Sequence, residues 1–174
     1  NAGKFLEKTL RSLMCNDLTG VELIVMDGGS TDDTARILAH YDGLFAHCIS
    51  EPDRGQSDAI NKGFARATQP ILYWLNGDDV ILPNTLNVVR RTFAAHPDTQ
   101  VMVPHSARHR PQGREVQLWR VRGVPFSWKW TRLAALRPPT SYALGRSALL
   151  PRIRSRKLWQ TSSSIRGIFT IPFF

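Results

Sequence analysis

Apolar runs and helix-spaced apolar residues alternate along the first hundred residues of the chain. Leu6, Leu10 and Leu13 recur at helical spacing within residues 5–14, and the apolar run at 21–26 is typical of a strand buried on both faces. The alternation continues with a helix at 35–41, a strand at 44–50, a turn at 51–55, a helix at 57–67, a strand at 70–75 and a helix at 83–96 that has Pro83 in its first turn. This order predicts an α/β fold with a mainly parallel sheet flanked by helices.

The pattern weakens after about residue 104. Residues 114–121 favour a strand and residues 130–136 favour a short helix, whereas the final 25 residues show no helical or strand period. We therefore divide the chain into an α/β region, 1–104, and a second region, 105–174, that ends in a basic and poorly patterned tail.

Charge divides the chain in nearly the same place. Residues 1–115 hold 12 Lys/Arg and all 14 Asp/Glu, a net charge of −2, while residues 116–174 hold 11 Lys/Arg and no acid, a net charge of +11. Such a basic stretch is compatible with binding to nucleic acid or anionic lipid, although its scattered charges favour a solvated tail. A non-catalytic binding module is thus the alternative hypothesis, with Trp119, Trp128, Trp130 and Trp159 as its candidates for stacking.

Composition places limits on the class of protein. The chain is 42% hydrophobic, which is enough for one domain with a core, and no run approaches the roughly 18 apolar residues of a membrane span. No basic-then-apolar leader is visible, and Cys15 and Cys48 form no CxxC pair. We expect both cysteines to be core residues and the setting to be reducing and cytoplasmic.

Three polar loops follow the three strands of the α/β region. They span 27–31, 51–55 and 76–79. In a parallel sheet the carboxyl ends of the strands share one edge, where ligands bind. Carboxylates gathered there would need a cation, and Mg²⁺ or Mn²⁺ takes one or two carboxylates together with phosphate oxygens, most simply those of a nucleotide diphosphate. The residues expected in this crevice are Asp27, Asp53, Arg54, Asp58, Asp78 and Asp79.

The first loop, DGGSTDDT, has other interpretations. An EF-hand calcium loop would need an oxygen ligand at Gly29, a glycine at Asp32 and a glutamate at Leu38, so that interpretation fails. The loop also lacks GxGxxG and the phosphate-loop Gly-Lys-Ser/Thr. A capped turn with Ser30 or Thr31 as the N-cap of the next helix remains the structural alternative.

Two further motifs have structural alternatives. NGDD, residues 76–79, could be a surface turn, because Asn-Gly is a strong turn signal. His105 and His109 have metal-ligand spacing if helical, but arginines surround them and no third ligand is near, which favours a solvated face.

The order VELIVMDGGSTDDT, ISEPDRGQSDAINKG, ILYWLNGDD resembles the nucleotide-sugar-binding half of the family 2 glycosyltransferases. These enzymes have the GT-A fold, and many of them synthesise bacterial polysaccharides. The resemblance covers residues 1 to about 104 and makes 105–174 a partial acceptor-side region. It implies transfer of a sugar, with inversion, from a nucleotide diphosphate donor to a glycan or lipid-linked acceptor, in the cytoplasm or peripherally at the inner face of the membrane, with no nucleic-acid partner.

The resemblance also implies roles for individual residues. Asp27 would contact the nucleotide base, Asp78 would face the ribose, and Asp78 with Asp79 would hold a divalent metal, Mg²⁺ or Mn²⁺. Asn76 stands where many relatives carry a third aspartate. The residues implied for donor binding are Asp27, Arg54, Gly55, Asp58, Asn76 and Asp78.

The chain departs from the family pattern at both ends. Residues 1–13 resemble the segment that follows the family's first strand, so a sheet strand is expected to be missing and to leave an apolar edge. Residues 138–149 resemble a segment that precedes the acceptor region, yet no Asp or Glu follows Glu115, so no catalytic base is assigned. These features predict a truncated or frame-shifted chain without transfer activity of its own.

Overall fold

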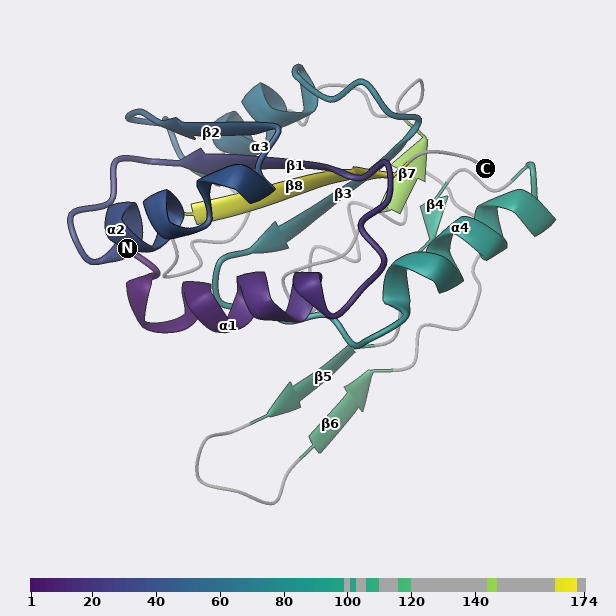
Figure 1. Ribbon diagram of the computed structural model, residues 1–174. Coiled ribbons are helices and arrows are strands. Elements are labelled where there is room, and N and C mark those ends of the chain that lie inside the picture. The colour runs from purple at the N-terminus through teal and green to yellow at the C-terminus, as the bar shows by residue number, and fades with distance from the viewer. Residues whose placement is uncertain (99–100, 103–105, 110–115, 120–143, 147–164, 172–174) are drawn as a thin grey trace.

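Six strands form one sheet in the order β2-β1-β8-β3-β7-β4, and two more form a separate antiparallel pair, β5-β6 (Figure 1). The computed structural model describes residues 1–98, 101–102, 106–109, 116–119, 144–146 and 165–171. The strands are β1 (Glu22–Asp27), β2 (His47–Ser50), β3 (Ile71–Asn76), β4 (Val101–Met102), β5 (Ser106–His109), β6 (Val116–Trp119), β7 (Leu144–Arg146) and β8 (Ile165–Ile171).

Among the described residues, four α-helices lie in the positions that the periodicity predicts. They are α1 (Gly3–Met14), α2 (Thr34–His40), α3 (Gln56–Phe64) and α4 (Thr85–Ala95), with a short 3-10 helix, η1 (Asp42–Leu44), before β2. Pro83 lies just ahead of α4 and not in its first turn, because Asn84 precedes the helix in a left-handed conformation, φ 67°. The predicted α/β class is confirmed, with helices and strands alternating through β3.

The strands of the first hundred residues run in one direction. β1 pairs with β2 in parallel, and β1 and β3 both pair antiparallel with β8, so β1 and β3 are parallel to each other. β7 pairs antiparallel with both β3 and β4. The parallel strands therefore come from the α/β part of the sequence, and the antiparallel ones from the region beyond residue 105.

β8 is the strand that the sequence did not reveal. It pairs with β1 from Glu22 to Asp27 and with β3 from Ile71 to Asn76. The expectation of an open apolar edge is wrong for these strands, because backbone N–H and C=O groups of 165–171 pair on both sides. Such pairing is independent of side-chain periodicity, which is why the final 25 residues gave no signal.

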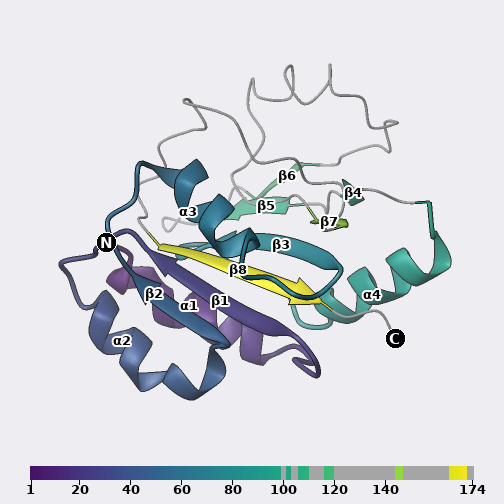
Figure 2. The same cartoon turned by 90° about the horizontal axis from the view of Figure 1, so that it is seen from above.

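Alternation within β1 and β3 divides the core into two layers. Leu23 and Val25 face the cluster formed with α1, α2 and α4, whereas Ile24 and Met26 face the cluster that contains Ala59 of α3. Figure 2 shows α3 on one face of the sheet and α1 and α2 on the other. In β3, Leu75 belongs to the first cluster and Trp74 packs on the second. Both faces are covered, as the apolar runs predict.

Several sequence expectations change at this level. Cys15 and Cys48 are exposed and not core residues, because Cys15 follows the last residue of α1 and Cys48 lies on the edge strand β2. His109 lies in a strand, so helical spacing to His105 does not apply. The strand expected at 114–121 is confirmed by β6, whereas the helix at 130–136 falls outside the described residues.

No helix in the described part of the chain is both long and apolar enough to cross a membrane.

Candidate functional site

Asp27 ends β1 and is buried, with 3% of its surface exposed. Its carboxylate accepts hydrogen bonds from the Ser30 amide (3.0 Å), the Ser30 hydroxyl (2.6 Å) and the Ser50 hydroxyl (2.6 Å). The Ser30 amide also lies 3.2 Å from the other carboxylate oxygen, so each oxygen of Asp27 has two donors. Asp27 is thus held in one orientation by the turn that follows β1 and by the end of β2.

The 51–55 loop connects β2 to α3 and is closed by two carboxylates. Asp53 Oδ1 accepts the Gly55 amide at 2.7 Å, and Asp58 Oδ2 accepts the Arg54 amide at 3.1 Å. Gly55 has φ 108° and ψ 173°, a conformation that is essentially restricted to glycine. The Arg54 side chain is 91% exposed and reaches Asp58 at 3.4 Å. The loop therefore presents a solvent-facing guanidinium beside the start of α3.

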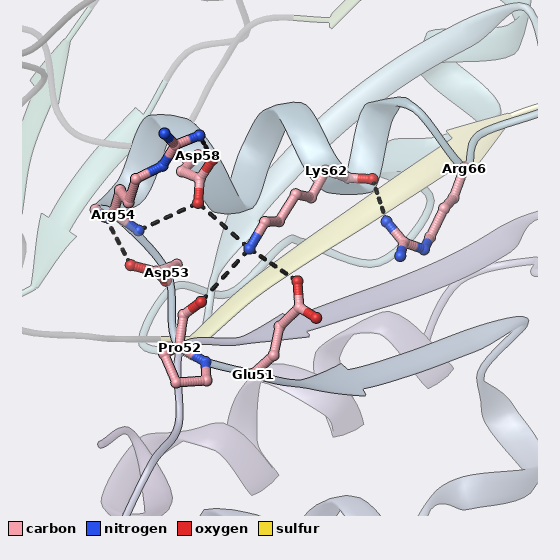
Figure 3. A network of polar contacts seen from close by, with 8 residues as sticks. Glu51, Pro52, Asp53, Arg54, Asp58, Lys62 and Arg66 are labelled. Atoms are coloured by element: carbon pink, nitrogen blue, oxygen red, sulfur yellow. Dashed lines mark hydrogen bonds and ion pairs between the residues drawn. The ribbon is translucent and has the colours of Figure 1, made fainter.

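Hydrogen bonding keeps Asp58 ionised. The backbone N–H of Arg54 lowers the pKa of Asp58, and the Lys62 ammonium lowers it further. Lys62 contacts Asp58 at 3.3 Å and Glu51 at 2.8 Å, which joins the loop to the second turn of α3 (Figure 3).

Asn76 and Asp79 form the third part of the site. Asn76 ends β3 and is fully buried, and its Nδ2 donates to Asp79 Oδ2 at 2.9 Å. The Asp79 amide in turn donates to the Asn76 carbonyl at 3.1 Å. An amide at position 76 can donate to this carboxylate, which an ionised aspartate there could not do. Asp78 is exposed and adjacent.

Two contacts join the three loops. The Glu51 amide donates to the Asp27 carbonyl at 2.9 Å, which joins the ends of β1 and β2. Gln56 Nε2 lies 3.4 Å from Asn76 Oδ1 and links the start of α3 to the end of β3. The predicted site residues therefore lie in three groups at the carboxyl ends of β1, β2 and β3, and hydrogen bonds join these groups to one another.

The arrangement of the side chains limits the ligands that the protein could supply to a metal ion at this site. Among the described residues, no three His, Cys, Asp or Glu side chains are placed together so as to hold an ion. Asp78 and Asp79 supply two adjacent carboxylates, and a hard divalent cation commonly takes one or two carboxylates and completes its shell with phosphate oxygens and water. The residues present therefore fit a metal that arrives with a phosphate-bearing ligand better than one held by the protein alone.

Helix α1 supports the segment after β3 from below the sheet. Thr9 Oγ1 donates to the Gly77 carbonyl at 3.0 Å, and Ser12 Oγ accepts the Ile81 amide at 3.2 Å. Asn16 donates to the Leu82 carbonyl at 3.2 Å and accepts the Leu86 amide at 3.3 Å. Thr9 and Ser12 share one face of α1, and Asn16 follows the end of the helix, so α1 and the residues just after it hold the backbone on both sides of Asp78 and Asp79.

Thr9→Val should lower the free energy of unfolding by about 1 kcal/mol, because it removes the hydroxyl donor to Gly77 while keeping the side-chain shape. Thr9→Ser keeps that hydroxyl and serves as the control. Urea denaturation of both variants measures the difference. Equal stability of Thr9→Val and the wild type would show that the Gly77 contact contributes nothing.

The turn after β1 differs from the capped turn considered above. The residue that precedes α2 is Asp33, and it makes no side-chain cap, so neither Ser30 nor Thr31 is the N-cap. The Ser30 hydroxyl binds Asp27 instead. Asp32 accepts the Gly3 amide at 2.9 Å, at the start of α1, and hydrogen bonds from Thr34 and Gly3 lower the pKa of Asp32.

Four residues of this network were not singled out from the sequence. Ser50 and Gln56 give little local signal, because their partners are 23 and 20 residues away in the chain. Lys62 was detectable, since it follows Asp58 at the i,i+4 spacing of helix ion pairs. Glu51 belongs to the polar loop 51–55, but its ion-pair partner Lys62 lies outside that loop, in α3.

Comparison with known proteins places this site in context. The model of the family described as Glycosyl transferase family 2 matches residues 1–155. Uncharacterized glycosyltransferase Rv1514c of Mycobacterium tuberculosis (strain H37Rv) is 40% identical over 75 residues, which cover 42% of this chain and 29% of that protein. Uncharacterized glycosyltransferase YibD of Escherichia coli (strain K12) is 29% identical over 103 residues, which cover 58% of this chain and 30% of that protein.

Poly-beta-1,6-N-acetyl-D-glucosamine synthase of Staphylococcus epidermidis is also similar, with 29% identity over 83 residues that cover 47% of this chain and 20% of the synthase. The chain therefore spans less than a third of the length of these relatives. No solved structure matches the chain significantly.

Proposed function

Because this chain belongs to glycosyl transferase family 2, we propose that it forms the donor side of a transferase that moves a sugar, with inversion, from a nucleotide diphosphate to a glycan or lipid-linked acceptor. The observation that carries the proposal is the hydrogen-bonded connection of three polar loops at the carboxyl ends of β1, β2 and β3. This edge is where open α/β sheets bind ligands.

Each group of the site has a role in this proposal. Asp27 is fixed by Ser30 and Ser50 and is the carboxylate assigned to a donor on the nucleotide base. Arg54 offers an exposed guanidinium to the diphosphate, and Asp58 holds the amide of Arg54. Gly55 allows the turn that brings this loop to the start of α3.

Asp78 and Asp79 would hold Mg²⁺ or Mn²⁺ together with the diphosphate oxygens. When bound, the metal would neutralise the negative charge that develops on the leaving diphosphate. Buried Asn76 acts in this proposal through Asp79, whose carboxylate it orients by a 2.9 Å hydrogen bond. Asp78, which is exposed, is the carboxylate assigned to the ribose side.

The relatives support a role in polysaccharide synthesis, since one of them is named poly-beta-1,6-N-acetyl-D-glucosamine synthase. We carry over to this chain the coarser part of that name, a transferase that acts on a glycan. Action at the inner face of the membrane, where a lipid-linked acceptor would lie, belongs to the same proposal.

Calorimetric titration of the chain with UDP, dTDP and GDP, each with and without Mn²⁺, tests the proposal. We expect one of the three to bind, and at least about tenfold more tightly with Mn²⁺, because the phosphate oxygens complete the metal shell. Mn²⁺ alone is the control and should bind weakly. Absence of binding by all three nucleotides, or binding unaffected by metal, would contradict the proposed function.

A further inference from the structure

Lys62 lies at the centre of a polar network that joins α3 to the 51–55 loop (Figure 3). Its side chain runs back along α3 toward the N-terminus of the helix, as long helical side chains do. The ammonium nitrogen lies 2.8 Å from Glu51 Oε1, 3.3 Å from Asp58 Oδ2 and 3.4 Å from the Pro52 carbonyl. An ammonium has three N–H donors, and three oxygens from two elements of the fold surround this one.

The contacts differ from an ordinary surface ion pair. The side chains of Lys62, Asp58 and Glu51 are 30%, 17% and 43% exposed, whereas those of the Arg11–Glu7 pair on α1 are 71% and 50% exposed. Partly buried pairs are screened less by salt and solvent than exposed ones. The hydrogen bond to Glu51 raises the pKa of Lys62, and Asp58 raises it further, so both contacts favour the charged form.

Both carboxylates that Lys62 holds connect directly to the donor loops. Asp58 accepts the Arg54 amide, and the Glu51 amide donates to the carbonyl of Asp27. Glu51 and Asp58 lie within 3.3 Å of the same nitrogen, so they face each other across it. Without the cation, the like charges of Glu51 and Asp58 would repel each other. Of the described side-chain contacts between the loop and α3, those of Arg54 with Asp58 would then remain.

We propose that Lys62 is a positioning residue of the donor site, whose ammonium holds the 51–55 loop against α3 and thereby fixes Arg54 and Asp58 for the nucleotide diphosphate. This inference rests on the proposed function, and it adds a residue that acts through Asp58 and Glu51. It assigns Lys62 no contact with the donor itself. The exposed Arg54 guanidinium remains the group proposed to contact the nucleotide diphosphate.

Three variants of the chain test this role with the nucleotide that binds the wild type in the titration above. Lys62→Met keeps the apolar stem and removes the cation, and Lys62→Arg restores a cation. Arg66→Met is the matched control, because Arg66 is exposed, lies one turn further along and hydrogen-bonds the Lys62 carbonyl without reaching the loop.

We expect Lys62→Met to weaken nucleotide affinity about tenfold, the effect of losing a partly buried ion pair. Lys62→Arg should recover most of that loss, and Arg66→Met should bind as the wild type does. Thermal unfolding of each variant shows whether the fold is kept at the assay temperature. Rescue by arginine separates positioning from a general loss of structure.

An affinity of Lys62→Met equal to that of Arg66→Met, or a loss that Lys62→Arg fails to reverse, overturns the inference. If Lys62→Met does not fold, Glu51→Gln removes the 2.8 Å ion pair while keeping Lys62, and unchanged affinity in that variant overturns it as well. If the wild type binds no nucleotide, the proposed function fails first, and the two failures are therefore distinguishable.

Discussion

Asp79→Ala should reduce nucleotide affinity in the presence of Mn²⁺ to the value measured without metal. Asp79 is one of two adjacent carboxylates proposed as metal ligands, and Asn76 orients it. Loss of a residue that only supports a ligand costs about 10- to 100-fold in metal affinity, so loss of the ligand itself should cost more than about 100-fold. The measurement is calorimetric titration of the variant with and without Mn²⁺.

Asp42→Ala is the control for this experiment, because Asp42 is an exposed carboxylate in η1 and has no place in the proposed site. It should keep the full metal effect. A metal effect that persists in Asp79→Ala would show that Asp79 is not a metal ligand, and would favour a turn as the role of its carboxylate, as the Asn-Gly signal alone also allows.

Asp27→Asn should lower both stability and nucleotide affinity. The Ser30 and Ser50 hydroxyls donate at 2.6 Å to different oxygens of Asp27. The change replaces one of these oxygens by an amide nitrogen that donates, so one hydroxyl loses its charged acceptor and the other faces a neutral one. Hydrogen bonds to charged groups contribute about 1.5 to 3 kcal/mol each, so the free energy of unfolding should fall by about 2 to 3 kcal/mol. Urea denaturation measures this loss, and titration with the bound nucleotide measures the affinity.

The matched control is Asp33→Asn, in the same turn, whose carboxylate is 70% exposed and pairs only with Arg36 at 3.4 Å among the described contacts. It should change stability by less than about 0.5 kcal/mol, the usual range for a surface site. If Asp27→Asn were as stable as this control and bound the nucleotide equally well, Asp27 would have neither role.

The parallel part of the fold was predictable because its signals are local. Apolar spacing located α1, α3 and β3 within a few residues of their observed bounds, and the order of three motifs identified the family, which the match over residues 1–155 confirms. Conversely, β8 depends on pairing with β1 and β3, which lie about a hundred or more residues earlier in the chain. Nothing in the composition of 165–171 specifies that partnership.

In the candidate site too, residues with a local sequence signal were predictable and residues that depend on distant partners were not. Asp27, Asp58 and Asp79 were identified because carboxylates at strand ends or helix starts stand out in the sequence. The groups that orient them are less visible, since Ser50 contacts Asp27 from the neighbouring strand β2, 23 residues away in the chain. The cysteines were misplaced for a related reason. Hydrophobicity predicts how often a residue type is buried, but it does not reveal that β2 is an edge strand.

Chemical-shift mapping of the backbone amides with Mg²⁺ and the bound nucleotide tests most directly whether the carboxyl edge of the sheet is the donor site. We expect the largest shifts in 27–31, 54–58 and 77–79, and little change at the opposite ends of the same strands, near Glu22 and Ile71. Shifts confined to those opposite ends or to the β5-β6 pair, with 77–79 unchanged, would contradict the assignment.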